Sequence, residues 1–205
     1  MKETKNTKTT SENKHQTLYP VIMAVPEAVK DLTPKERVKF LSEQARRALK
    51  ISAKKSQVPL GKMEQDERNA PLPFEGTYWS ITHKTEYVAG VIAPSPVGID
   101  IEKICSRATS LFQKTATTAE WALADMTLKT FFRYWTAKEA VLKAAGIGLT
   151  ALSKCRVIHV PDAQHLDIEY DARTYHVQHH YVEDHIASIV KNKFQVEWTI
   201  VKTQP

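Results

Sequence analysis

The chain has 205 residues, of which 42% are hydrophobic and 25% charged, and its formal net charge is +6. This is ordinary globular composition, with room for one large domain or two small lobes. The sequence excludes a membrane-spanning helix, because no apolar run in it approaches the roughly 20 residues that cross a bilayer. The two cysteines lack metal-type or disulfide-framework spacing and indicate a reduced, cytoplasmic protein. The positive charge favours an anionic partner, such as nucleic acid, a phosphorylated small molecule or an acidic protein.

The first 17 residues form a distinct segment. Residues 1–17 carry no apolar side chain after Met1 and are rich in Lys, Thr, Asn, Ser and Glu. Such a segment cannot bury enough surface to offset its conformational entropy, so we expect a disordered polar tail. It has no apolar core region and no arginine, so we expect neither a secretory signal nor a mitochondrial transit peptide.

A strand followed by a helix is predicted next. Leu18–Val25 has the composition of a first strand. Thr33 is a helix N-cap followed by a proline, and Glu36 completes a capping box. Apolar residues at helical spacing carry this helix to about Ile51, and its other faces are basic. Residues 52–76 are polar and broken by proline, which indicates loops.

Three short strands are predicted after these loops: Tyr78–Thr82, Glu86–Ala93 and Val97–Glu102. A Pro-Ser-Pro turn separates the last two, so we expect them to form a hairpin. In Val97–Glu102 the apolar residues alternate with Asp100 and Glu102, which therefore project on one face while the apolar row faces a core. Two adjacent carboxylates repel each other unless a cation or proton lies between them.

Helices are predicted over residues 106–125 and 127–145, and Gly146 is a suitable stop for the second. Glu139 and Lys143 lie four residues apart on one face of the second helix. Trp135, one turn earlier, places Glu139 at the margin of an apolar stripe.

Asp100, Glu102 and Glu139 could bind one Mg²⁺, which takes oxygen ligands. Lys143 could then contact a phosphate. The competing interpretation is a solvent-facing strand edge and a surface Glu139–Lys143 pair, because pairs with this spacing are common on helices.

Other polar residues admit the same two interpretations. His83 and Lys84 end a predicted strand and could hold a phosphate through N–H donors, or simply form a turn. Arg46 and Arg47 could do so from the first helix, or lie on a solvated face. Lys138 is about 100° from Glu139 around its helix, and we expect it on a solvated flank.

Five further strands are predicted near residues 155–160, 166–170, 174–181, 185–190 and 195–201. Separate runs of helices and antiparallel strands indicate an α+β fold. Four histidines gather here, and a zinc site is conceivable because two of them share a strand face. No nearby cysteine or carboxylate completes such a site, so we expect structural roles for His176, His179, His180 and His185.

Two motifs together resemble the 4′-phosphopantetheinyl transferases of the surfactin-synthetase-activating type. The family pairs G-[IV]-D-[IV]-E with a later W-x-x-K-E-[AS]-x-x-K-x-x-G-x-G-[LF], and both occur here, beginning at Gly98 and Trp135. The resemblance covers about residues 78–152. The segment Ser80–Lys84 occupies the place of N-[IL]-S-H-S but departs from it at three positions. Residues 69–71 retain only the proline of G-[KR]-P.

The resemblance implies a pseudo-dimer of two similar α+β lobes, residues 18–96 and 97–205, with coenzyme A in the cleft between them. A chain holding both lobes is expected to work as a monomer. The implied reaction moves 4′-phosphopantetheine from coenzyme A to a serine of an apo acyl or peptidyl carrier protein and releases 3′,5′-ADP. Neither a nucleic acid nor a membrane is an expected partner.

Residue roles follow from the same resemblance. Asp100, Glu102 and Glu139 are expected to hold Mg²⁺, with Glu139 also the general base for the serine. Lys143 is expected to stabilise the departing phosphate of 3′,5′-ADP.

The 3′-phosphate of coenzyme A is expected to contact His83 and also Arg47. Thr82 is expected to bind the coenzyme as well, as is Lys143. Glu120 lies near a weaker family motif and is a possible supporting residue.

Two other functions remain open at this point. A Mg²⁺-dependent phosphohydrolase or nuclease could use the same carboxylates. A basic nucleic-acid-binding module is less well supported, because the basic residues are scattered and the aromatic residues have core spacing.

Overall fold

The computed structural model describes residues 17–67, 69–147 and 149–202. Apart from Thr17, the expected polar tail lies outside these residues, as does Gly148 of the second motif. No helix in the described ranges is both long and apolar enough to cross a membrane. The α+β class predicted from the sequence is confirmed.

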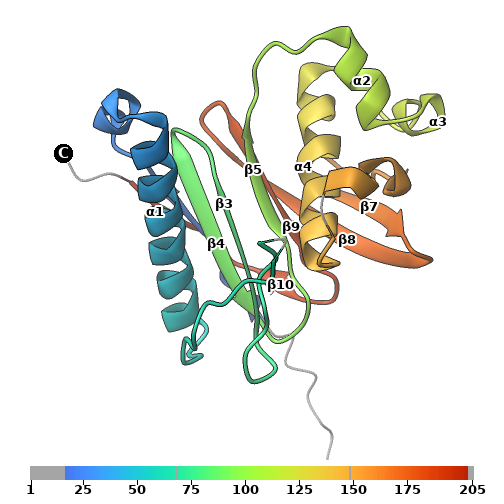
Figure 1. The fold of residues 1–205 in the computed structure, drawn as a ribbon. Coiled ribbons are helices and arrows are strands. Elements are labelled where there is room, and N and C mark those ends of the chain that lie inside the picture. The colour runs from blue at the N-terminus through green and yellow to red at the C-terminus, as the bar shows by residue number, and fades with distance from the viewer. Residues whose placement is uncertain (1–16, 68, 148, 203–205) are drawn as a thin grey trace, which may run out of the picture.

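The described chain folds as four layers, in the order helix, sheet, sheet, helix (Figure 1). The first layer is α1 (Pro34–Lys55), and α4 (Leu128–Ala144) is the last. Between the two sheets lies an apolar cluster that includes Ile22, Ala89 and Ile101. Each sheet therefore buries one face against its own helix and the other against the second sheet.

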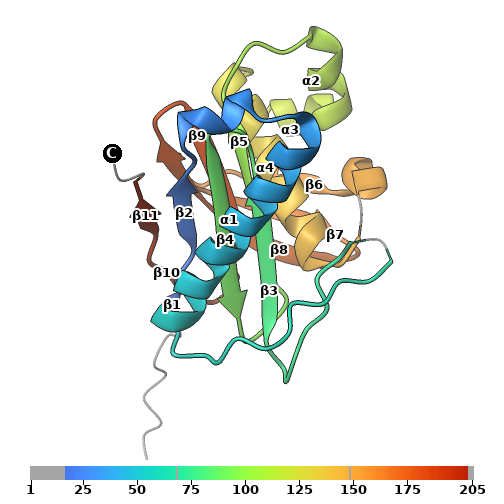
Figure 2. The ribbon, with the colours of Figure 1, turned by 60° about the vertical axis from the view of Figure 1, so that its left-hand side comes forward.

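The first sheet has the strand order β11-β2-β4-β3. Its strands are β2 (Val21–Ala24), β3 (Tyr78–His83), β4 (Tyr87–Ala93) and β11 (Thr199–Val201). The end of the chain returns to this sheet, where β11 pairs in parallel with β2 at the outer edge (Figure 2). Nearby, β1 (Thr17–Leu18) and β10 (Gln195–Val196) form a separate parallel pair.

The second sheet has the order β5-β9-β8-β7-β6 and is antiparallel throughout. Its strands are β5 (Ile99–Lys103), β6 (Arg156–His159), β7 (His165–Tyr170), β8 (Arg173–Val182) and β9 (His185–Val190). The expected strand at 195–201 is divided between β10 and β11, and neither part belongs to this sheet.

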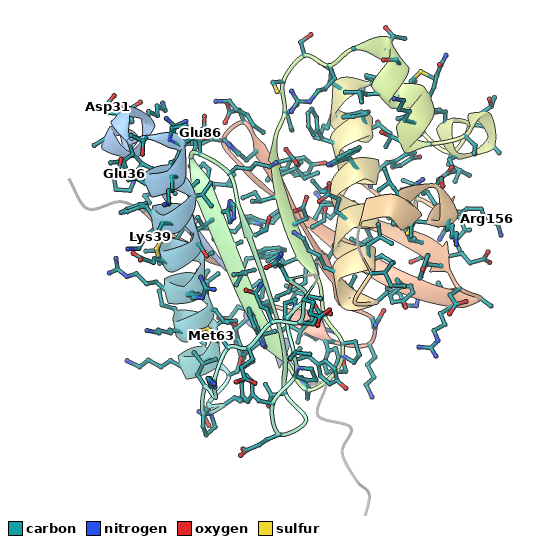
Figure 3. The ribbon with its side chains drawn as sticks, in the orientation of Figure 1. Asp31, Glu36, Lys39, Met63, Glu86 and Arg156 are labelled. Atoms are coloured by element: carbon teal, nitrogen blue, oxygen red, sulfur yellow. The ribbon has the colours of Figure 1, made fainter. Side chains whose placement is uncertain are left out.

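The start of α1 follows the capping chemistry of its sequence. The Thr33 hydroxyl accepts the Glu36 N–H at 3.4 Å, and the Glu36 carboxylate accepts the Thr33 N–H at 3.1 Å. Glu36 lies at this end of the helix in Figure 3. A short 3₁₀ helix, η1 (Glu27–Asp31), precedes it. Gly90 lets α1 approach β4 closely, because a Cβ there would lie 2.7 Å from the Leu49 nitrogen.

The expected hairpin between Glu86–Ala93 and Val97–Glu102 is wrong. After the Pro-Ser-Pro turn the chain leaves the first sheet, and β5 pairs with β9, from Ile99↔Ile189 to Lys103↔His185. Such a partner, some ninety residues away, is not specified by local turn chemistry.

The region expected to be one helix over 106–125 instead forms α2 (Thr109–Thr115) and α3 (Thr118–Trp121). Ala116 is extended, and Thr117 starts the second helix with a capping box to Glu120. The local capping signal thus divides the segment. A 3₁₀ helix, η2 (Leu149–Lys154), follows α4.

Candidate functional site

The two predicted motifs meet where α4 packs on β5. Gly98 makes this approach possible, because a Cβ there would lie only 1.8 Å from the Ala140 carbonyl oxygen. Ile99 and Ile101 point into the cluster between the sheets, as the alternation predicted. Asp100 lies opposite Ser188 of β9, whose hydroxyl bonds Thr136 of α4, so this face of the sheet is the one covered by α4.

Three carboxylates converge at this junction. Asp100, Glu102 and Glu139 each offer an oxygen within 4.8 Å of the others. Asp100 is 2% exposed and Glu102 is 7% exposed, so the pair is buried and does not form a solvent-facing strand edge. Among the described residues, this is the group of His, Cys, Asp and Glu side chains whose geometry suits a metal ion.

Burial and mutual repulsion make the cluster favourable for a cation. Burial, followed by the Asp100 charge, raises the pKa of Glu139 to about 7. Burial also raises the pKa of Glu102. Asp100 Oδ2 is buried and has no hydrogen-bond partner among the described atoms. An all-oxygen donor set with an unsatisfied buried oxygen fits Mg²⁺, which prefers such ligands.

Two lysines and a threonine contact the carboxylates. Lys143 Nζ lies 2.7 Å from Asp100 Oδ1 and donates to the Ile99 carbonyl at 3.0 Å. Thr82 Oγ1 donates to the same Asp100 oxygen at 2.9 Å. Lys84 Nζ lies 2.6 Å from Glu102 Oε1. Thr82, a predicted coenzyme contact, thus orients a carboxylate from the neighbouring sheet.

A cavity of about 340 Å³ opens beside the cluster. Its walls carry the cationic or basic side chains of Arg46, His83, Lys84 and Lys143, while Asp100 and Glu139 supply the acidic part. His83 is open to solvent at its edge, but desolvation by the surrounding walls and the charges of Lys143 and Lys84 lower its pKa. The cavity is therefore suited to a polyanion with a cation beside it.

A second cavity of about 260 Å³ adjoins the first and has a more apolar lining. Glu139 and Lys143 border both cavities. The remaining wall of the second cavity includes Pro71, Leu142 and Ile147. The carboxylate cluster thus lies between a charged and an apolar compartment.

The structure distinguishes Arg46 from Arg47, the arginine that the family resemblance implied as a phosphate contact. Arg46 lines the charged cavity, where its guanidinium hydrogen-bonds Ser42. Arg47 is exposed and donates to Gln44 at 3.2 Å, and it is not among the residues that line either cavity. One step along a helix rotates a side chain by about 100°, so only one of two consecutive arginines faces the cavity.

Lys138 is not on a solvated flank, and that expectation is wrong. It is 1% exposed, and its Nζ lies 2.6 Å from Glu120 Oε1 and 2.7 Å from the Thr115 carbonyl oxygen. Burial would raise the pKa of Glu120, but hydrogen bonds from Lys138 and from backbone N–H groups outweigh it and lower that pKa. Glu120 also accepts the Val157 N–H, so the pair joins α3, α4 and β6.

The histidines of β8 and β9 have separate partners. His176 bonds Asp167, His179 bonds Ser188 and His180 stacks on Trp198. His185 is buried against Asp184 and Glu86. In the described parts of the chain, the group with metal-binding geometry is the carboxylate cluster, which includes none of these histidines.

Comparison with known proteins now bears on this site. Residues 96–191, which include β5, the carboxylate cluster and α4, match the model of the 4′-phosphopantetheinyl transferase superfamily. Over these residues the chain is similar to the domain that defines this superfamily. The resemblance seen in the sequence motifs is thereby confirmed.

Two curated relatives agree with the superfamily assignment. A Haemophilus influenzae protein provisionally named as a 4′-phosphopantetheinyl transferase is 33% identical over 133 residues, covering 60% of this chain and 55% of the relative. The 4′-phosphopantetheinyl transferase gsp of Aneurinibacillus migulanus is 29% identical over 90 residues, covering 42% of this chain and 38% of the relative. The chain thus spans about half, or less, of the length of these relatives.

Proposed function

We propose that this protein transfers 4′-phosphopantetheine from coenzyme A to a serine of an apo acyl or peptidyl carrier protein, releasing 3′,5′-ADP in a Mg²⁺-dependent reaction. The observation that carries the proposal is the convergence of three carboxylates beside a cationic cavity, within the residues that match the 4′-phosphopantetheinyl transferase superfamily. The same carboxylates alone would suit a phosphohydrolase, and the superfamily match is what favours group transfer.

Asp100, Glu102 and Glu139 would hold the Mg²⁺ ion. When bound, the ion would neutralise charge on the diphosphate of coenzyme A. The two cavities suggest how the coenzyme lies, because its nucleotide phosphates suit the charged compartment and its less polar pantetheine arm suits the apolar one. The diphosphate would then lie at the shared border, next to Lys143.

Glu139 is the proposed general base. Its carboxylate borders both cavities, so a serine hydroxyl that enters beside the coenzyme would approach it directly. A carboxylate has two oxygens, so one can face a ligand while the other accepts a proton. The serine oxygen would form a bond to the β-phosphorus of coenzyme A as its proton passes to Glu139. The bond from that phosphorus to the bridging oxygen breaks, and the oxygen leaves on 3′,5′-ADP.

The remaining cations would position the substrate. Lys143 would stabilise negative charge on the departing phosphate, since its ammonium already lies at the carboxylate cluster. His83 and Arg46 line the charged cavity and are proposed contacts for the phosphates farther from the reaction. Arg47, which the family resemblance implies, would have to reach those phosphates from outside the cavity lining. Orientation by such contacts is a large part of catalysis in phosphoryl transfer.

We further propose that one chain is sufficient for activity. Ser42 and Arg46 of α1 and His83 of β3 come from the first helix–sheet pair, whereas Asp100 of β5 and Glu139 of α4 come from the second. Both sides of the cavity thus belong to the same chain, as two lobes of a monomer would require. The positive net charge would favour encounter with an acidic carrier protein.

The test is a mixture of purified protein, Mg²⁺, coenzyme A and an apo carrier protein, followed by intact-mass spectrometry. The carrier should gain the mass of phosphopantetheine, and Glu139→Gln should lower the rate by at least about a hundredfold. Glu27→Gln is a matched control, because Glu27 is exposed and pairs only with Lys30 in the described contacts. Coenzyme A hydrolysis without carrier modification would instead support a phosphohydrolase.

A further inference from the structure

Lys84 places an ammonium group directly on a candidate metal ligand. It follows β3, and its Nζ lies 2.6 Å from Glu102 Oε1. The Lys84 side chain is 39% exposed, whereas that of Glu102 is 9% exposed, so the ammonium approaches a buried carboxylate from the solvent side. The family motif N-[IL]-S-H-S has a serine at this position, so this cation is a feature of the present chain.

Lys84 is held less firmly than the other lysine of the site. Lys143 contacts both Asp100 and the Ile99 carbonyl. For Lys84, Glu102 is the hydrogen-bonding partner of Nζ in the described structure. A lysine has a flexible four-carbon stem, and Lys84 lines the same cavity as His83 and Lys143, so its ammonium can move within that cavity without a change in the backbone.

We propose that Lys84 is an exchangeable counter-ion that occupies Glu102 in the free protein, competes there with the divalent cation, and becomes an additional phosphate-binding group when the cation takes that carboxylate. This inference rests on the proposed function. Metal and coenzyme then bind cooperatively through one residue, because the ion that displaces Lys84 frees an ammonium for the coenzyme diphosphate.

The charges of the site give the reason for this exchange. In the free protein, the three carboxyl groups lie beside two ammonium groups, from Lys84 and Lys143. A divalent cation among the carboxylates would leave local positive charge in excess until a phosphate group bound. By thermodynamic linkage, metal binding that displaces Lys84 raises the affinity for the phosphate ligand, and binding of the phosphate ligand raises the affinity for the metal by the same factor.

The test combines two titrations on Lys84→Ser. Without coenzyme, the variant should bind Mn²⁺ about fivefold more tightly than the parent, because the competing ammonium is gone. With Mg²⁺ saturating, it should bind coenzyme A about tenfold more weakly, because a charge-assisted phosphate contact is lost. A purely structural residue would not shift the two affinities in opposite directions. Lys84→Arg, which keeps the cation, should retain most of the coenzyme affinity.

Lys103→Ser is the matched control. Lys103 has a similarly exposed side chain, at 42%, and lies next to Glu102 in β5, but it pairs with Glu86 and Asp184. Its loss removes the same charge from the protein and should change either affinity by less than about twofold.

The possible outcomes separate the inference from the proposed function. If Lys84→Ser leaves both affinities unchanged, or lowers both together while its thermal melting matches the parent, the exchange is refuted. If the parent binds Mn²⁺ but not coenzyme A, the proposed function is refuted along with the phosphate-binding role. The Mn²⁺ titration then decides whether Lys84 is a counter-ion for Glu102.

Discussion

Gly98→Ala should damage the metal site through a backbone collision. The added Cβ would lie 1.8 Å from the Ala140 carbonyl oxygen, whereas ordinary contact begins at 3.4 Å, so α4 must retreat by about 1.6 Å. Glu139 directly precedes Ala140 and would move with it, away from Asp100. Overpacking of this kind costs about 1–3 kcal/mol of the unfolding free energy. A displacement of about 1 Å in a catalytic group can cost about a hundredfold in rate.

Gly90→Ala provides the comparison for this variant. A Cβ at Gly90 would meet the backbone of Leu49 at 2.7 Å, so it also separates a helix from a sheet, but the helix is α1. Urea unfolding should show that both variants are destabilised. A Mn²⁺ titration and the carrier-modification assay should show a large loss only for Gly98→Ala. If Gly98→Ala kept metal affinity and transfer rate within about twofold of the parent, the proposed role of close α4–β5 packing would be refuted.

Three further predictions follow, two on pH and one on a buried ion pair. Because burial and Asp100 raise the pKa of Glu139 to about 7, protons compete with metal below that pH, and Mn²⁺ affinity should fall by up to about tenfold between pH 7 and pH 6. The same raised pKa means that the free energy of unfolding of the metal-free protein falls as the pH rises from 4.5 to about 7. Urea unfolding can measure this change, and no loss of stability in this range would contradict the raised pKa of Glu139. Lys138→Met should lower the unfolding free energy by about 3–5 kcal/mol, because it leaves Glu120 buried without its ammonium partner. The control is Lys30→Met, which removes an exposed lysine and should cost under about 1 kcal/mol. A similarly small cost for Lys138→Met would refute the proposed importance of the Lys138–Glu120 pair.

Local signals in the sequence predicted much of the site. Alternation placed Asp100 and Glu102 on one strand face, and a four-residue spacing placed Glu139 and Lys143 on one helix face. The capping box at Thr33 was confirmed in the structure. Each of these patterns depends on the side-chain period within a single strand or helix, which can be recognised from the local sequence.

Features that depend on distant partners could not be predicted in the same way. The pairing of β5 with β9 depends on a strand far along the chain. The burial of Lys138 depends on Glu120 and Thr115, which helical spacing within α4 cannot reveal. Likewise, the difference between Arg46 and Arg47 follows from which face of α1 meets the cavity.

The most direct test of the proposed site is whether a metal ion and the coenzyme diphosphate lie side by side in it. Mn²⁺ broadens the ³¹P resonances of phosphates close to it, so these resonances can be followed for coenzyme A bound to the protein. We predict strong broadening of the diphosphate signals with the parent chain and its loss with Asp100→Asn, while the Lys103→Ser control behaves like the parent. Unchanged diphosphate signals with bound Mn²⁺ and bound coenzyme A would contradict a shared site at Asp100, Glu102 and Glu139.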